Sequence, residues 1–95
     1  VLKRMKEIKE SDGSSMLDNS LVTYGAALGD GSTHQYYDLP MLVAGRGQGQ
    51  VKQGRFIQCK SGTLNSNLWL SVAKLMGLEM ESFADSTGVI SDMWT

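Results

Sequence analysis

Residues 20–45 read SLVTYGAALGDGSTHQYYDLPMLVAG, two apolar runs separated by a polar segment that holds the chain's single histidine. The first run, 21–28, contains the β-favouring triplet Val-Thr-Tyr, and its apolar residues do not alternate with polar ones. This pattern is typical of a strand buried on both faces, as in parallel sheets covered by helices. Residues 40–44 predict a second strand. The segment between them is rich in glycine and turn formers, so it predicts a long loop that leaves the end of the first strand.

A helix is predicted on each side of this stretch. Apolar residues at helical spacing among charged ones predict an amphipathic helix that starts at the first residues and ends near 11–13. The second helix is predicted to start after Thr63 as its cap and to stop at Gly77, with Trp69 beside its apolar stripe. That stripe consists of Leu64, Leu68, Val72, Leu75 and Met76. Helices that flank a sheet indicate an α/β fold.

The segment between the second strand and the second helix contains two turn signals and the only cysteine. The sequence GRGQGQ at 45–50 favours a glycine-rich surface turn; the alternative is an anion cradle in which backbone N–H groups and Arg46 hold an oxyanion. Gln53 and Gly54 predict a β-hairpin turn. Cys59 then falls in a strand, where a lone cysteine is expected to be a small buried residue.

The tail after the second helix shows no periodicity. We expect Phe83 to hold it against the body and a turn to form at 85–88. Met93 and Trp94 are expected to be disordered or to contact another chain.

Composition excludes several classes of partner. Nine basic and ten acidic residues give a net charge of -1 in 95 residues, without a basic block, so neither nucleic acid nor a membrane surface is an expected partner. No apolar run is long enough to span a bilayer. The helical pattern begins at Val1 without an initiating methionine or a cap, which indicates a fragment. We therefore expect residues 1–95 to form a single partial domain that associates with itself through uncovered sheet edges.

Asp30 and His34 are the residues in the loop best suited to chemistry. Glycines on both sides of Asp30 allow the backbone to turn the carboxylate and the imidazole toward one place. Such a pair suits Zn²⁺, or Mn²⁺ with more oxygen ligands; the alternative is a hydrogen-bonded pair that orders the loop. Asp38 and Tyr36 are candidate outer-shell groups, Asp38 by accepting the other ring N–H of His34. The alternative is that the tyrosines cover the edge of the sheet and that Asp38 orders the turn that follows it.

The order DNSLVTYGAALGDGSTHQYYDLPMLVAGRGQG, followed by NLWLSVAKLMGLEMESFADSTG, resembles the C-terminal part of an uncharacterised family of large secreted bacterial proteins. That family is placed in the alkaline phosphatase and sulfatase-like superfamily, and the resemblance runs from about Leu17 to Gly88. It implies a three-layer sandwich with a mixed sheet flanked by helices, a secreted or periplasmic location, and a partner in the missing N-terminal part of the chain.

The resemblance also implies a metal site. Enzymes of that superfamily bind metal ions through Asp and His at strand ends, and Asp30 and His34 are similar in position to two of these ligands. The implied cofactor is a divalent metal: zinc, manganese or calcium. Superfamily enzymes often have His directly after that Asp, whereas this chain has Gly31, which argues against a two-metal arrangement. The superfamily's nucleophile lies outside this chain.

Two functions follow as hypotheses. The first is the C-terminal segment of a metal-dependent phosphatase- or sulfatase-like hydrolase, inactive alone, with Asp30 and His34 as metal ligands. The second is a non-catalytic structural or interaction module that retains the fold, which Gly31 favours. A glycan- or peptide-binding surface built from Tyr36, Tyr37 and Trp94 is the third and weakest hypothesis.

Overall fold

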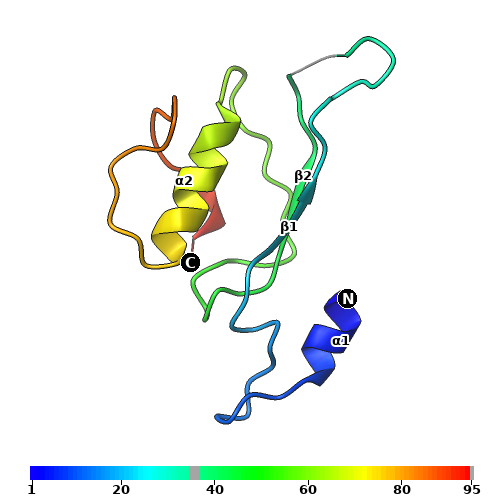
Figure 1. Ribbon diagram of the computed structural model, residues 1–95, viewed down its shortest axis with the longest axis vertical. Helices are drawn as coiled ribbons and strands as arrows, with labels where there is room; N and C mark the ends of the chain where they lie inside the picture. Colours follow the sequence, from blue (N-terminus) through cyan, green and yellow to red (C-terminus); the bar gives the residue numbers. More distant parts are fainter. Residues whose placement is uncertain (35–36, 95) are drawn as a thin grey trace.

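A computed structural model describes residues 1–34 and 37–94 of the chain. The elements in chain order are helix α1 (Leu2–Glu7), strands β1 (Val22–Gly25) and β2 (Met41–Ala44), helix α2 (Asn65–Leu75) and a short 3-10 helix η1 (Ser91–Met93). The molecule measures 45 × 32 × 20 Å, with α2 on one side, the two strands on the other and α1 at one end (Figure 1). It is thus a mixed α and β fold in the general sense predicted. No helix in the described parts of the chain is both long and apolar enough to cross a membrane.

The two predicted strands form, but they are antiparallel. Val22 pairs with Ala44 and Gly25 with Met41, so the chain returns along itself through the loop 26–40. A parallel pair needs a crossover connection, usually a helix, and this loop has no helical spacing. The described sheet has only these two strands, and Tyr24 and Leu42 are 76% and 67% exposed. The prediction of a parallel strand buried on both faces is therefore wrong.

Helix α2 forms the centre of the small core. Leu70 is 1% exposed and Leu68 is also buried, and the other buried apolar side chains of the described structure are Val51 and Met93. The predicted stripe is therefore rotated, because Met76 is 64% exposed and Leu70 was not in it. The predicted cap is also wrong: Leu64 is the N-cap, no described side chain accepts a hydrogen bond from the first helical N–H groups, and the Thr63 hydroxyl donates to the Lys60 carbonyl at 2.6 Å.

The C-terminal tail is attached to α2 by polar groups rather than by an aromatic side chain. The tail is hydrogen-bonded to three side chains of the helix, Ser66, Asn67 and Ser71, and all three are buried. Phe83 is 44% exposed, so its predicted anchoring role is wrong. A turn forms two residues earlier than the predicted 85–88: Ser86 N–H donates to the Phe83 carbonyl at 2.9 Å, so the turn spans 83–86.

The end of the tail packs on its own chain. Met93 is buried, and its carbonyl accepts the Lys52 N–H at 2.9 Å. Trp94 forms an isolated antiparallel bridge with Val51. The expectation that Met93 and Trp94 are disordered is therefore wrong, whereas the alternative, contact with another chain, stays a prediction.

Two further predictions fail between β2 and α2. Residues 52–64 form no strand, so Gln53 and Gly54 do not start a hairpin, and the Gln53 amide instead donates to the Gly45 carbonyl. Cys59 is exposed rather than buried, because the segment has no neighbouring strand to cover it.

Helix α1 is shorter than predicted and buries no residue. It ends at Glu7, because Ile8 adopts an extended conformation. The chain then folds back on the helix, with Met16 N–H donating to the Ile8 carbonyl at 2.8 Å and Leu17 N–H to the Met5 carbonyl at 3.2 Å. Residues 16 and 17 thus lie against the first helix and the residue that follows it.

Candidate functional site

The predicted metal ligands lie in the loop that joins β1 to β2. This loop extends away from α1 at the far end of the hairpin (Figure 1). Asp30, His34 and Asp38 are all exposed. One carboxylate oxygen of Asp30 accepts the Ser32 N–H at 2.9 Å, a local Asx turn that fixes the carboxylate relative to the backbone. His34 and Asp38 both adopt left-handed backbone conformations, with φ of 56° and 55°.

The structure brings Asp30 and His34 into one turn but does not complete a metal site. Within residues 1–34 and 37–94 there is no group of three or more His, Cys, Asp and Glu side chains that could hold a metal ion. Two protein ligands are fewer than the three or four that zinc sites use. No hydrogen bond joins Asp38 to the His34 ring in this part of the chain, and Tyr36 lies outside the described residues.

The glycine-rich segment after β2 lies against the turn formed by residues 16–19. The N–H groups of Arg46, Gly47 and Gln48 donate to the carbonyls of Leu17 at 3.3 Å, Ser20 at 3.1 Å and Asp18 at 2.9 Å, respectively. Three consecutive N–H groups are therefore occupied by the chain's own carbonyls. They are not free to cradle an anion. The segment forms the predicted turn, but only part of it is at the surface, because Gly45 and Gly47 are buried.

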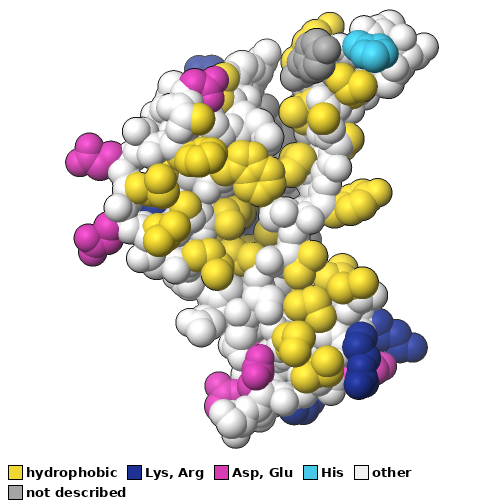
Figure 2. All heavy atoms as spheres, viewed as in Figure 1, with side chains coloured by type: hydrophobic (Ala, Val, Ile, Leu, Met, Phe, Trp, Pro, Cys, Tyr) yellow, Lys and Arg dark blue, Asp and Glu magenta, His cyan; other side chains and the backbone are white. Residues whose placement is uncertain are grey.

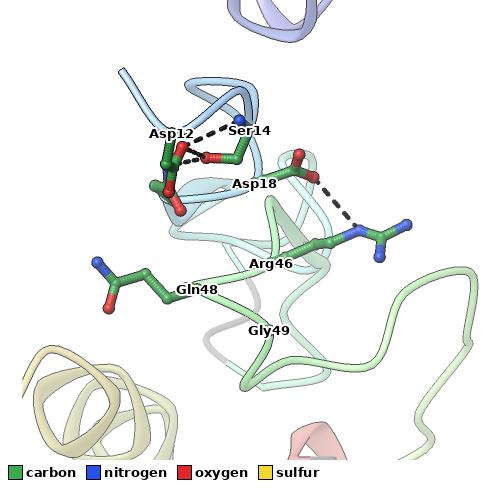
Figure 3. A pocket seen from close by; sticks show the side chains of 7 residues that line it. Asp12, Ser14, Asp18, Arg46, Gln48 and Gly49 are labelled. Carbon is green, nitrogen blue, oxygen red and sulfur yellow. Dashed lines mark hydrogen bonds and ion pairs between the residues drawn. The ribbon is translucent and has the colours of Figure 1, made fainter. Parts of the chain in front are cut away.

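Arg46, the predicted anion-binding cation, has a carboxylate beside it. Its Nε lies 3.5 Å from Asp18 Oδ1, and both side chains are partly exposed (Figure 3). The pKa of Asp18 is lowered mainly by hydrogen bonds from the Ser15 N–H and hydroxyl, with a smaller contribution from the charge of Arg46. Binding of an external anion by Arg46 stays a prediction that would have to overcome this neighbouring negative charge.

An open hollow of about 450 Å³ lies beside this ion pair. Asp12, Ser14 and Asp18 line it together with the glycine-rich segment (Figure 3). The pKa of Asp12 is lowered because the Ser14 hydroxyl and N–H both donate to its carboxylate. Both acids are thus held by hydrogen bonds within their own turns, which accounts for their arrangement without a ligand.

A second hollow, of about 310 Å³, lies between the hairpin and α2. Thr23 and Met41 line it from the strands and Trp69 from the helix, and none of its lining side chains is ionisable. It therefore has no carboxylate, imidazole or amine for general acid–base chemistry. Trp69 therefore lies on the side of α2 that faces the hairpin.

The polar contacts between α2 and the tail were missed by the sequence analysis. Ser66 Oγ donates to Asp85 at 2.7 Å, and the Thr87 N–H donates to Asn67 Oδ1 at 2.8 Å. Ser71 Oγ accepts the Ile90 N–H at 2.7 Å while donating to the Asn67 carbonyl. The available signal was Asn67 and Ser71 at helical spacing beside buried leucines, because polar residues so placed need partners.

Comparisons with protein-family models, with curated proteins and with solved structures found no match to this chain.

Proposed function

We propose that this chain is the C-terminal α/β segment of a larger, secreted or periplasmic, metal-dependent phosphatase- or sulfatase-like hydrolase, and that Asp30 and His34 are two of its metal ligands. One observation supports this above the others. The only imidazole of the chain and a carboxylate share a single exposed turn in the loop that joins the two strands of the hairpin. Neither side chain is covered by the described residues, so both are accessible to ligands supplied from elsewhere.

The hairpin itself supports membership of a larger sheet. A two-stranded sheet is at best marginally stable alone, and sheets normally gain further strands or a covering layer. Both faces of β1 and β2 carry apolar side chains, and within the described residues the two strands pair only with each other. In the proposed parent, additional strands would extend this pair into the mixed sheet of a three-layer sandwich.

The donor set fits part of a divalent metal site. One carboxylate and one imidazole suit zinc or manganese, and carboxylate oxygen also suits calcium. A metal bound there would neutralise a phosphoryl or sulfuryl oxygen and lower the pKa of a bound water. Asp30 and His34 would hold and orient it, while the remaining ligands and the nucleophile would come from the missing part. The segment is therefore expected to be inactive alone.

Zinc titration of the chain, followed by NMR, tests this proposal. We expect saturable shifts of the His34 ring and of the amides at 31–33. Asp30→Asn should weaken binding by at least about tenfold, since loss of an outer-shell partner alone often costs that much. Asp92→Asn, which changes an exposed acid outside the loop, is the matched control and should leave binding unchanged. Equal zinc affinity in the Asp30→Asn and wild-type chains would refute shared coordination.

A second candidate is the non-catalytic structural or interaction module. Two observations favour it: Gly31 stands where the superfamily often has a histidine, and the Asp30 carboxylate already orders its own turn through Ser32. In that case Asp30→Ala lowers the melting temperature, and zinc changes the melting temperature of neither protein. A thermal melt with and without zinc separates the two candidates.

A further inference from the structure

The sequence Asp-Gly-Ser occurs at 12–14 and again at 30–32, and both copies form the same local turn. In each turn a carboxylate oxygen of the aspartate accepts the N–H of the serine at 2.9 Å. This Asx turn holds the carboxyl group beside the peptide that follows it. Because glycine has no Cβ atom, no side chain shields the next backbone nitrogen from that carboxyl group. The same two reactive groups are therefore adjacent at two places in the chain.

Further hydrogen bonds secure the first of these turns. The Ser14 hydroxyl also donates to the Asp12 carboxylate. The Gly13 N–H donates to the Glu10 carbonyl at 3.0 Å, and the Glu10 N–H donates to the Ser14 carbonyl at 2.7 Å. The Asn19 amide donates to the Ser14 hydroxyl at 2.8 Å. Both the carboxyl group of Asp12 and the amide of Gly13 are thus held by other groups.

The second turn has none of these additional bonds to described residues. Within residues 1–34 and 37–94, only the Ser32 N–H donates to the Asp30 carboxylate, and no carbonyl accepts the Gly31 N–H. Residues 29–34 are all exposed. The loop that contains them projects from the body of the molecule and carries the chain's single histidine (Figure 2). Water therefore reaches this turn, and its reactive groups are less constrained than those of the first.

From this contrast we infer that the peptide between Asp30 and Gly31 is a site of spontaneous isomerisation of aspartate to isoaspartate, whereas the fold protects the matching peptide at 12–13. The Gly31 nitrogen attacks Cγ of Asp30. The N–Cγ bond forms, the bond from Cγ to the carboxyl hydroxyl breaks, and that hydroxyl leaves with the amide proton as water. The product is a five-membered cyclic imide.

Water then opens the imide at either of its two carbonyl carbons. Opening at Cγ restores aspartate, and opening at the former backbone carbonyl gives isoaspartate, in which the chain runs through Cβ and Cγ. One water leaves and one returns, so the mass is unchanged and nothing is oxidised or reduced. The backbone gains a methylene group, and the carboxylate is now attached to Cα, which moves it relative to His34. This inference does not depend on the proposed metal chemistry, since it uses only a carboxyl group, an amide and water.

Incubation of the folded 95-residue chain in mildly acidic buffer tests the inference. The chain is then digested with a peptidase that cleaves before aspartate but not before isoaspartate. Isomerised Asp30 leaves the uncleaved peptide 18–37, and isomerised Asp12 leaves 1–17. Incubation in heavy-oxygen water marks both products, because the water that opens the imide stays in the peptide. We expect 18–37 to accumulate at least about fivefold faster than 1–17, since closure at Asp12 must first break two hydrogen bonds.

The same incubation in urea is the control for sequence. Both turns read Asp-Gly-Ser, so unfolding should remove most of the difference between their rates. Equal rates in the folded chain, an undiminished difference in urea, or no isomerisation at either turn would overturn the inference.

Three variants test the individual contacts. Gly31→Ala should slow the reaction at 30 without unfolding the chain, because the φ of Gly31 is not positive and a Cβ atom there meets nothing within 4 Å. Ser14→Ala removes the hydroxyl bonded to Asp12 and should speed the reaction at 12 by about two- to tenfold. Ser32→Ala is its matched control and should leave the rate at 30 unchanged, because no described residue bonds the Ser32 hydroxyl. Unchanged rates in both Gly31→Ala and Ser14→Ala would overturn the inference.

Discussion

Ser20 and Gly45 are held in direct backbone contact: a Cβ atom on Gly45 would overlap the Ser20 carbonyl oxygen. The same oxygen accepts the Gly47 N–H at 3.1 Å. The glycine-rich segment therefore has a structural purpose in this chain. It brings the end of β2 against the turn that precedes β1, at the end of the hairpin opposite its loop.

Gly45→Ala should destabilise the chain by about 2–4 kcal/mol, because it combines a backbone overlap with a φ of +97° that alanine tolerates poorly. Gly54→Ala is the matched control: its φ is +69°, but a Cβ atom there meets nothing. Gly54→Ala should lower the free energy of unfolding by only about 1–2 kcal/mol. Urea unfolding midpoints measure both changes, and equal losses would mean that the contact with Ser20 is unimportant.

Asn67→Ala should release the tail from α2. Asn67 is buried and accepts the Thr87 N–H, while its amide donates to the Thr87 hydroxyl at 3.2 Å. Removing it breaks both of these part-buried hydrogen bonds to Thr87, which costs about 0.5–1.5 kcal/mol for each bond. Hydrogen exchange should show faster exchange at Thr87 and Ile90. Asn65→Ala, on the exposed side of the same helix, should leave both amides unchanged.

Leu70→Ala should cost about 2–5 kcal/mol, because its side chain is almost fully buried in the core. Met76→Ala, on the same helix, should change the free energy of unfolding by less than about 0.5 kcal/mol, because that side chain is mostly exposed. Thermal or urea unfolding distinguishes this arrangement from the stripe predicted from sequence, in which Met76 was a core residue. A large loss for Met76→Ala with a small one for Leu70→Ala would contradict the structure.

Stability should fall in acid. The folded-state pKa values of Asp12 and Asp18 lie below their ordinary value of 3.8, so the unfolded chain binds these protons more readily. Their contribution is therefore present above that value and is lost as the pH falls through the lowered pKa values. Asp18→Asn should flatten the acid side of the stability profile. Arg46→Gln should flatten it less, because the Ser15 hydrogen bonds lower the pKa of Asp18 more than the charge of Arg46 does. Equilibrium unfolding measured across the acid range would show whether this order holds.

The sequence predicted the positions of helices, strands and loops more accurately than it predicted tertiary contacts. Apolar runs placed both strands of the hairpin, and the glycine at 77 marked the end of α2, where its φ is +89°. The candidate pair Asp30 and His34 was correctly placed in a loop, since turn-forming residues surround it. The pairing direction and the identity of the buried leucine were not predicted, because both depend on residues distant in the sequence.

Cys59 illustrates the same limit. An apolar run before a cysteine is consistent with a buried strand only if a second strand lies beside it, and no local signal reports whether one does. The polar tail contacts are similar, since Asn67 and Thr87 are separated by twenty positions.

Local chemistry by itself determined where this chain turns, where its strands and its second helix lie, and which loop carries the imidazole and carboxylate. These features depend on backbone preferences and on side chains a few residues apart, which the sequence displays directly. Only the tertiary structure decided that the strands are antiparallel, that Leu70 is the most buried leucine, and that Arg46 lies beside Asp18. Such outcomes depend on which distant segments bury one another's surface and satisfy one another's hydrogen bonds.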